Sequence, residues 1–281
     1  MINLINLQNS IYQSPWFVLP SAHGVLRQQY ENIFTGKIQM PDTFPMEPDD
    51  MPENDDSGSM DSGSMESNIA VIEVDGVIGK HLGWIETMLF GMVDVDVISE
   101  QLDEAVSDPN IDTIVFYFCT PGGTVNGTPE LASKIAEASK VKNTIAYFDV
   151  MCCSAGYYLA SQCNAIYASP TVHAGSVGVY SIYLDTSVML ANEGVKINAI
   201  SAGSKKLSGA EWKPMSDEER VMFQSEVDKI YIQFKSAVTS KRAIADEDLQ
   251  GQCFTSDDLI NKNIIDGYAN SLNELLAFLV N

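Results

Sequence analysis

The sequence predicts an α/β protein in which repeated βα units build a layered, mostly parallel sheet. Short β-branched runs alternate with amphipathic stretches from residue 69 onward, and such units join by right-handed crossovers. Residues 111–118 are nearly continuous in apolar side chains, as strands buried on both faces of a parallel sheet are. With 281 residues and 45% hydrophobic side chains, the chain suits one large or two small domains with a full core.

The elements are expected in a regular order along the chain. A short helix over residues 21–35 belongs to an N-terminal extension. Strands are expected at residues 69–74, 111–118, 144–148, 165–168, 178–183 and 196–200. Helices are expected at residues 95–106, 129–139, 154–162, about 186–193 and 216–242. Ile98, Leu102 and Ala105 share one face of the first of these helices. A cap-like segment, Ser216-Asp217-Glu218-Glu219, opens the last and longest one.

Charge and composition exclude several classes of function. The chain has 16 Lys and Arg against 38 Asp and Glu, a net charge of −22, which repels phosphate backbones and anionic lipid surfaces. We therefore expect no nucleic-acid partner. The first 20 residues lack the basic and apolar regions of a secretory signal, and no stretch approaches the roughly 20 apolar residues of a membrane span, so neither secretion nor membrane insertion is expected.

The five cysteines are an odd number without the paired spacing of a zinc site. We expect them to be reduced, buried thiols of a cytoplasmic protein. No cluster of ligating residues stands out in the sequence, so no metal and no cofactor are expected.

Three segments divide the chain. Residues 1–40 form a partly ordered extension. Residues 41–67 carry nine acidic residues, four prolines and no basic residue, which is typical of a disordered acidic linker. Residues 68–281 form the main domain.

The segment around Ser154 is the most informative for chemistry. Ser154 stands directly after an expected strand and is followed by small residues, where backbone N–H groups and a helix dipole can stabilise an oxyanion. The same position also suits an ordinary helix N-cap, and the local sequence leaves both interpretations open.

Two further segments are candidates. Pro121-Gly122-Gly123 follows a buried strand, where paired glycines let a backbone N–H approach a carbonyl oxygen closely, although a plain turn would use the same residues. Lys205 and Lys206 follow the expected strand over residues 196–200. A lysine serves as a general base only if burial or nearby positive charge lowers its pKa, and otherwise the pair is simply solvated.

In this order, the three segments resemble the signal peptide peptidase A family of serine peptidases over residues 69–270. Pro121-Gly122-Gly123 resembles its oxyanion turn, and Ser154-Ala155-Gly156-Tyr157-Tyr158 resembles its nucleophile segment. Gly175-Ser176-Val177-Gly178-Val179 resembles the family's next motif, about 20 residues later. The family's base is a lysine about nine residues before a Pro-Met helix start, and counting back from Met215 reaches Lys206.

The resemblance implies a Clp protease/crotonase-like fold and a serine endopeptidase with a Ser154/Lys206 dyad. Lys205 is the fallback base, and the N–H groups of Gly122, Gly123 and Ala155 would hold the oxyanion. The family also implies a ring-like homo-oligomer with shared active sites.

The expected branch of the family is that of the bacteriophage prohead proteases. An anchoring helix like that of the membrane-bound members is not expected here, whereas a polar extension and an acidic linker match the phage branch. This implies a capsid or scaffold protein as the substrate, cleaved inside the assembling procapsid in the host cytoplasm.

Several alternatives stay open. His173 lies 19 residues after Ser154 and could act as the base in a Ser/His site. Cys152 and Cys153 adjoin the serine, but apolar surroundings suppress thiol reactivity, so we expect them to pack beneath it. A crotonase-type acyl-CoA enzyme and a non-catalytic scaffold protein are the competing functions.

Overall fold

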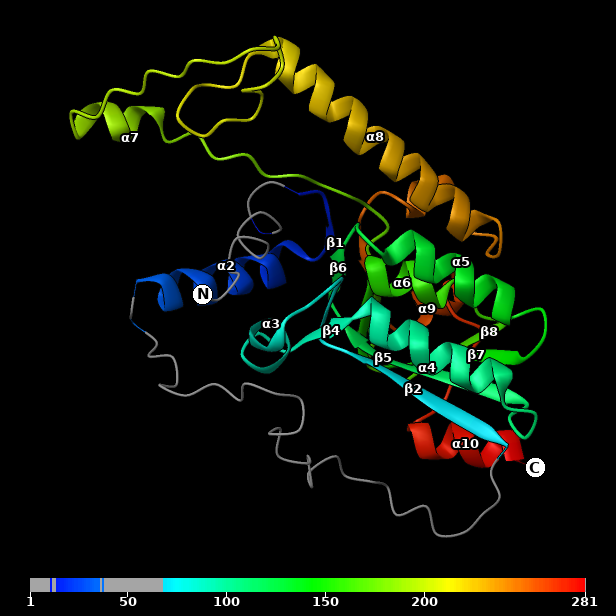
Figure 1. Ribbon diagram of the computed structural model, residues 1–281. Coiled ribbons are helices and arrows are strands. Elements are labelled where there is room, and N and C mark those ends of the chain that lie inside the picture. The colour runs from blue at the N-terminus through cyan, green and yellow to red at the C-terminus, as the bar shows by residue number, and fades with distance from the viewer. Residues whose placement is uncertain (1–10, 12–13, 36, 38–67, 281) are drawn as a thin grey trace.

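The computed structural model describes residues 11, 14–35, 37 and 68–280. The expected acidic linker over residues 41–67 lies outside these residues. Figure 1 shows an α/β body from which an arm projects, made of α7 and its flanking segments and carried by the long helix α8. Across the described part of the chain, no helix combines the length and apolar character needed to span a bilayer.

The main sheet is almost entirely parallel. Its strands lie in the order β10-β9-β7-β5-β2, with β8 paired to β7 and β11 paired to β8. Only β10 runs antiparallel to its neighbour. The strands are β2 (Ile69–Asp75), β5 (Thr113–Thr120), β7 (Asn143–Cys153), β8 (Ala165–Ala168), β9 (His173–Gly175), β10 (Cys253–Phe254) and β11 (Gly267–Tyr268). The central strand β7 pairs with β8 along its first half and with β9 at its carboxyl end.

A second, smaller sheet has the order β1-β6-β3-β4. Its strands are β1 (Trp16–Val18), β6 (Gly122–Thr124), β3 (Val77–Gly79) and β4 (Met92–Asp94). β1 pairs with β6 antiparallel, whereas β3 pairs in parallel with both β6 and β4. This sheet therefore joins the N-terminal extension to the glycine turn that follows β5.

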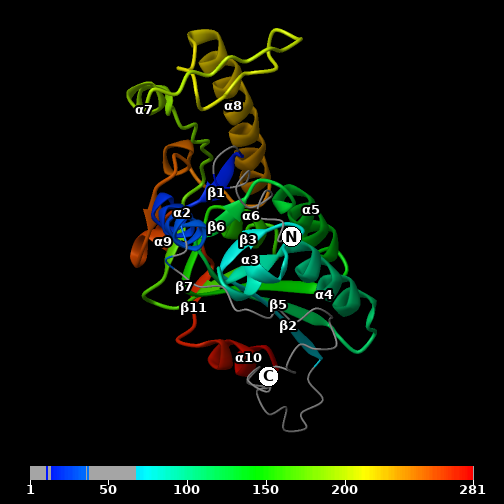
Figure 2. The same ribbon diagram turned by 60° about the vertical axis from the view of Figure 1, so that its left-hand side comes forward.

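Helices cover both faces of the main sheet. They are α2 (Pro20–Phe34), α3 (Trp84–Met88), α4 (Val95–Ser107), α5 (Thr128–Ala138), α6 (Ala155–Ala160), α7 (Ser187–Asn192), α8 (Asp217–Thr239), α9 (Asp257–Asn261) and α10 (Leu272–Val280), with a 3₁₀ turn at Asp246–Asp248. Figures 1 and 2 show α4 and α5 on one face and α10 on the opposite face.

The sequence of β5 explains why both faces are covered. Ile114, Phe116 and Phe118 pack into the large core beneath α4, α5 and α6. The alternate residue Val115 packs on the other face with Leu275 of α10. Successive strand residues point to opposite faces, so a nearly continuous apolar run requires two cores.

The start of α8 has the expected cap. The Oγ of Ser216 accepts a hydrogen bond from the backbone N–H of Glu219 at 3.3 Å, and the Glu219 carboxylate accepts one from the N–H of Ser216 at 2.8 Å. Lys213 also binds this carboxylate at 2.5 Å. The bond from Lys213, followed by those from Ser216, lowers the pKa of Glu219 to about 2. The predicted capping segment is therefore confirmed.

The expected helices and the first four expected strands are confirmed, with shifts of a few residues at most ends. The prediction of strands at residues 178–183 and 196–200 is wrong. The first segment forms only an isolated bridge between Trp16 and Tyr180, and the second is an exposed segment without strand pairing. β-branched residues favour a strand only where a partner edge runs alongside them. Residues 178–183 meet the edge of β1 at a single residue pair, and residues 196–200 lie on the arm, which projects away from both sheets.

Leu102 tests the packing of α4 on the sheet, because its side chain is fully buried. The variant Leu102→Ala should lower the free energy of unfolding by about 2–5 kcal/mol, since it removes buried apolar contacts and leaves a cavity. The matched control is Val97→Ala in the same helix, where the side chain is half exposed and the change should stay within about 0.5 kcal/mol. Urea denaturation followed by circular dichroism measures both, and equal losses would contradict the packing described.

Candidate active site

Ser154 lies at the carboxyl end of the central strand, on the sharp turn between β7 and α6. Its backbone angles are φ 54° and ψ −113°, a conformation that is strained for a residue other than glycine. The backbone N–H donates to Gly175 O at 2.8 Å, and Ser154 O accepts from the N–H of Tyr158 at 2.8 Å. The serine is thus fixed by the edge of β9 on one side and by its own helix on the other.

The side chain of Ser154 does not cap the helix. Although the residue occupies the N-cap position of α6, its hydroxyl makes no capping hydrogen bond. The Oγ instead donates to Gly178 O at 3.4 Å. The local sequence left open an ordinary N-cap or a serine placed near an oxyanion site. The geometry excludes a capping hydrogen bond from the side chain.

The glycine turn lies directly beside this serine segment. Thr120, at the end of β5, pairs with Cys152 near the end of β7. A Cβ on Gly156 would lie only 2.4 Å from Thr120 Cγ2, so α6 approaches the turn as closely as it does because residue 156 is glycine. The N–H of Gly122 donates to Thr120 Oγ1 at 3.1 Å. The two motifs thus form one compact site at the carboxyl edge of the sheet.

The candidate oxyanion donors come from both sides of this site. Gly123 lies in β6, where a Cβ would lie 2.0 Å from Ile78 O, so only glycine permits the pairing of β6 with β3. Gly122 has φ 111°, in the region that favours glycine. Ala155 is the first residue of α6, where the N–H groups have no intrahelical acceptor. All three positions belong to the two motifs that meet at this edge of the sheet, and the Gly122 N–H already donates to Thr120 Oγ1.

The candidate lysines lie at the far end of the arm and are exposed. Lys205 pairs with Glu218 at the start of α8. At the other end of this helix, Phe234 stacks on Tyr158, with ring centroids 4.5 Å apart. At about 1.5 Å per residue, the helix carries the lysine loop roughly 25 Å from that contact. Figure 1 shows the start of α8 well away from α6, and the structure of one chain therefore does not bring the lysine loop to the serine turn.

His173 is also separate from the serine hydroxyl. It is an exposed residue in β9, paired with Met151. Among the described residues, no hydrogen bond joins His173 to Ser154; its backbone oxygen instead accepts a weak contact from Cys153 Sγ at 3.6 Å.

Cys152 and Cys153 are buried beside Ser154, as expected, and burial raises the pKa of Cys152 well above its usual value. The expectation that every cysteine is buried is wrong for Cys253, which is exposed in the short edge strand β10, and for Cys119, which is partly exposed in β5. Its Sγ lies 3.7 Å from Cys153 Sγ. Hydrogen bonding from the Cys153 thiol lowers the pKa of Cys253 to about 7.

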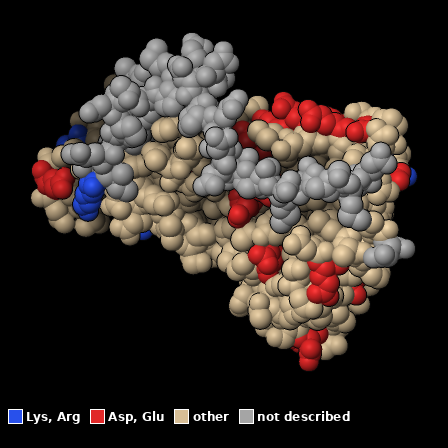
Figure 3. Space-filling view, turned by 90° about the horizontal axis from the view of Figure 1, so that it is seen from below, with Lys and Arg blue, Asp and Glu red and all other residues tan. Residues whose placement is uncertain are grey.

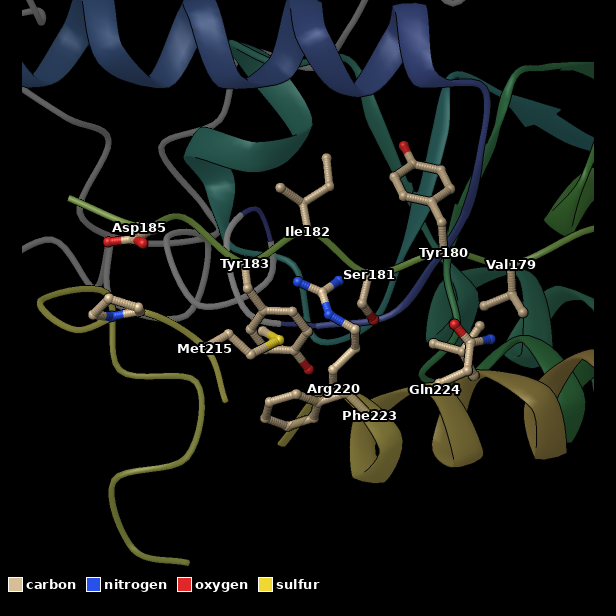
Figure 4. A pocket seen from close by; sticks show the side chains of 12 residues that line it. Val179, Tyr180, Ser181, Ile182, Tyr183, Asp185, Met215, Arg220, Phe223 and Gln224 are labelled. Carbon is tan, nitrogen blue, oxygen red and sulfur yellow. The ribbon is translucent and has the colours of Figure 1, made fainter. Parts of the chain in front are cut away.

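A cleft of about 670 Å³ lies between the arm and α8 (Figure 4). Tyr183 of the arm stacks on Phe223 of α8 with ring centroids 4.2 Å apart. The cleft is also lined by Val179, Tyr180, Ser181, Ile182, Asp185, Pro214, Met215, Arg220, Gln224 and Val227. Its first lining residue along the chain, Val179, directly follows Gly178, whose carbonyl oxygen accepts the hydrogen bond from Ser154 Oγ.

Acidic side chains predominate over basic ones on the face shown in Figure 3. This distribution agrees with the net charge of −22. Within the described residues, no three His, Cys, Asp or Glu side chains gather in a way that could hold a metal ion.

The profile of Peptidase family S49 matches residues 136–275. The chain is 29% identical over 226 residues to capsid assembly protease C of Escherichia phage lambda, covering 79% of this chain and 51% of that protein. It is 28% identical over 220 residues to head-tail preconnector protein GP5 of Enterobacteria phage P21, covering 74% and 44%. Protease 4 of Salmonella typhi is 28% identical over 203 residues, covering 70% and 32%.

Over residues 136–275 the chain is therefore similar to peptidase family S49, the signal peptide peptidase A family, and two of the three relatives are phage proteins. Its parallel sheet with helices on both faces agrees with the Clp protease/crotonase-like α/β class implied by the sequence. The chain spans about half or less of the length of these three relatives.

The thiol beside the site should titrate near neutral pH. Because the pKa of Cys253 is lowered to about 7, its thiolate forms well below the usual pH for cysteine, and alkylation by iodoacetamide should reach half its maximal rate near pH 7. Cys153→Ala removes the main hydrogen-bond donor and should move this midpoint upward by more than one pH unit. Cys119, whose pKa is raised to about 11, is the internal control. Peptide mass spectrometry measures each rate. A midpoint near pH 9 for Cys253 in both the wild-type protein and the Cys153→Ala variant would contradict the contact between the two thiols.

Proposed function

We propose that this protein is a serine endopeptidase in which Ser154 is the nucleophile and Lys206 of a neighbouring subunit is the base. The observation that carries the proposal is the serine on its strained turn, in contact with the paired-glycine turn at the carboxyl edge of the sheet. The match of residues 136–275 to a peptidase family supports the same chemistry.

In the proposed reaction, Ser154 Oγ attacks the carbonyl carbon of the scissile peptide bond. The hydroxyl proton moves to the neutral amine of Lys206. The N–H groups of Gly123 and Ala155, with Gly122 beside them, stabilise the oxyanion that forms. Collapse of this intermediate breaks the C–N bond, and the leaving amine takes the proton from Lys206. Water then hydrolyses the acyl-enzyme with Lys206 again acting as the base.

The shared site rests on the distance between the two residues and on the surface of the arm. Lys206 is exposed, and its loop lies at the end of α8 opposite to the one that contacts Tyr158 of α6. The arm and the start of α8 expose large apolar side chains, namely Val188, Met189, Val195, Ile197, Ile200, Trp212 and Val221. A second copy of the chain would cover this surface and give residues 178–183 and 196–200 partner strands. Burial in that interface would also lower the pKa of Lys206, as a base at neutral pH requires.

We further propose a role in prohead maturation, with a capsid or scaffold protein as the substrate, inside the procapsid in the host cytoplasm. The support is the similarity to a protein named for capsid assembly. In this proposal residues 68–281 form the peptidase domain, and residues 41–67 tether the extension over residues 1–40 to it. Lys205 and His173 are the alternative bases.

Removal of the nucleophile should abolish cleavage. Ser154→Ala should reduce the rate of cleavage of the cognate capsid or scaffold protein by about 10⁴-fold or more, with an unchanged circular dichroism spectrum. Ser133→Ala, an exposed serine of α5, is the matched control and should keep full activity. Gel analysis of the substrate measures both variants. Retained proteolysis in Ser154→Ala would exclude this serine as the nucleophile.

Mixing inactive variants tests the shared site. Ser154→Ala and Lys206→Ala should each be inactive alone, because each lacks one member of every dyad. In equimolar mixed rings about one interface in four joins an intact serine to an intact lysine, so about a quarter of the wild-type activity should return. Lys205→Ala should stay active.

Native mass spectrometry must first confirm that subunits have exchanged. Confirmed mixed rings without activity, or a fully active monomer, would contradict the shared site. Lys205 or His173 would then become the leading base.

A further inference from the structure

The strand β1 lies between the two walls of the Ser154 site. On one side it pairs antiparallel with β6, with Phe17 opposite Gly123 and Val18 opposite Gly122. On the other side the N–H of Trp16 donates to Tyr180 O at 2.9 Å, and the N–H of Tyr180 donates to Trp16 O at 3.2 Å. A segment of the N-terminal extension thus fills the space between the glycine turn and the segment that follows β9.

Both walls belong to the proposed catalytic machinery. The first wall, β6, contains the glycines proposed to hold the oxyanion. The second wall begins at Gly178, whose carbonyl oxygen accepts the hydrogen bond from Ser154 Oγ. A peptide that is to be cut at Ser154 must present an extended backbone between these walls, and pairing with both edges is the usual way in which an extended peptide is held.

The register of β1 engages one proposed oxyanion donor. The N–H of Leu19 donates to Pro121 O, and the N–H of Val125 donates to Pro15 O. Hydrogen-bonded pairs alternate along an antiparallel ladder, so Phe17 and Gly123 form the hydrogen-bonded pair between these two bonds. The Gly123 N–H is therefore directed to the backbone oxygen of Phe17. A Cβ on Gly122 would lie 2.1 Å from the same oxygen, which shows how closely β1 enters the site.

The side chains of β1 are buried as completely as those of the core. Phe17 is 0% exposed and packs edge-on against Tyr158 of α6 and Phe234 of α8, which stack on each other, with ring centroids 5.7 Å and 4.9 Å from that of Phe17. Trp16 and Val18 point to the opposite side, into a separate cluster with the extension's own helix α2. Of the three β1 side chains, Phe17 is therefore the one whose pocket contains no other residue of the N-terminal extension. The body contains a pocket for one bulky apolar side chain of an extended segment.

We propose that Trp16–Val18 is an internal ligand of the peptide-binding groove of Ser154. The groove takes an extended peptide with a large aromatic or aliphatic residue in the Phe17 pocket, and it opens to such a peptide only when β1 leaves. This inference rests on the proposed function for the meaning of the groove, but binding of the peptide does not require Ser154 to react.

The test uses a fluorescein-labelled heptapeptide with the sequence of residues 14–20 and the full-length chain carrying Ser154→Ala, so that no cleavage interferes. A second full-length variant carries Trp16→Ala and Phe17→Ala in addition to Ser154→Ala. These two changes remove the buried side chains that hold β1 in place. Fluorescence anisotropy should give a Kd for the peptide that is at least tenfold lower for this second variant than for the chain with Ser154→Ala alone. The same peptide with Phe17→Asp should lose this binding, because its carboxylate would enter an apolar pocket.

Val25→Ala in α2 is the matched control, because this side chain is 58% exposed and α2 belongs to the same extension. It should leave the Kd unchanged. Equal Kd values with and without the two β1 substitutions would overturn the proposal, as would a folded double variant that does not bind the peptide. If cleavage is absent in the wild-type chain but peptide binding behaves as expected, the proposed function fails and the groove assignment stands.

A second measurement uses the chain with Ser154→Ala alone, in case the double variant does not keep its fold. Peptide at saturating concentration should displace β1 and raise hydrogen exchange at the amides of Trp16 and Phe17. Exchange in β5 should not change. A bound peptide that leaves the exchange of residues 16–18 unchanged occupies another surface and would refute the proposal, as would the absence of binding at any concentration.

Discussion

The structure depends on the close contact between two turns at the carboxyl edge of the main sheet. One turn follows β5 and carries Gly122 and Gly123, and the other joins β7 to α6 and carries Ser154. Their approach is possible because Gly156 leaves room for Thr120, and because Gly123 leaves room for Ile78 O in the small sheet. A side chain at either glycine would separate the layers by more than an ångström. The glycine that permits the pairing of β6 with β3 is thus also one of those proposed to hold the oxyanion.

The body and the arm satisfy different physical requirements. The body buries its apolar strands on both faces and is complete within one chain. The arm exposes apolar side chains, including a fully exposed Ile200, and its extended residues 196–200 lack a strand partner. A surface of this kind is stabilised when another copy covers it. Placing the lysine on the arm and the serine in the body would therefore make the active site depend on assembly.

The N-terminal extension belongs to the fold rather than being attached to it. Phe17 contacts the core through Tyr158 and Phe234, and Trp16 bonds to the backbone of Tyr180. The extension thus uses backbone edges that a substrate would need. Stability gained from these contacts opposes the opening of the groove, which links the resting structure of the chain to the control of its proposed activity.

The sequence alone determined the elements whose signal is local. The two-faced strand β5, the helix α4 and the capped start of α8 follow from periodicity and from side chains within a few residues of one another. Ser154 and the paired glycines could be singled out because each follows a strand, and parallel strands end at the same edge of a sheet.

Only the tertiary structure decided the features that depend on distant partners. The three-residue strands β1, β3, β4 and β6 are too short to show a period, and each exists because another edge lies beside it. The β-branched residues 196–200 carried a strand signal but have no edge to join. Cys253 is exposed and near Cys153 because β10 joins the end of the sheet after some hundred residues of intervening chain. Hydrogen bonds between distant segments are set by the packing of the whole chain, which no local pattern encodes.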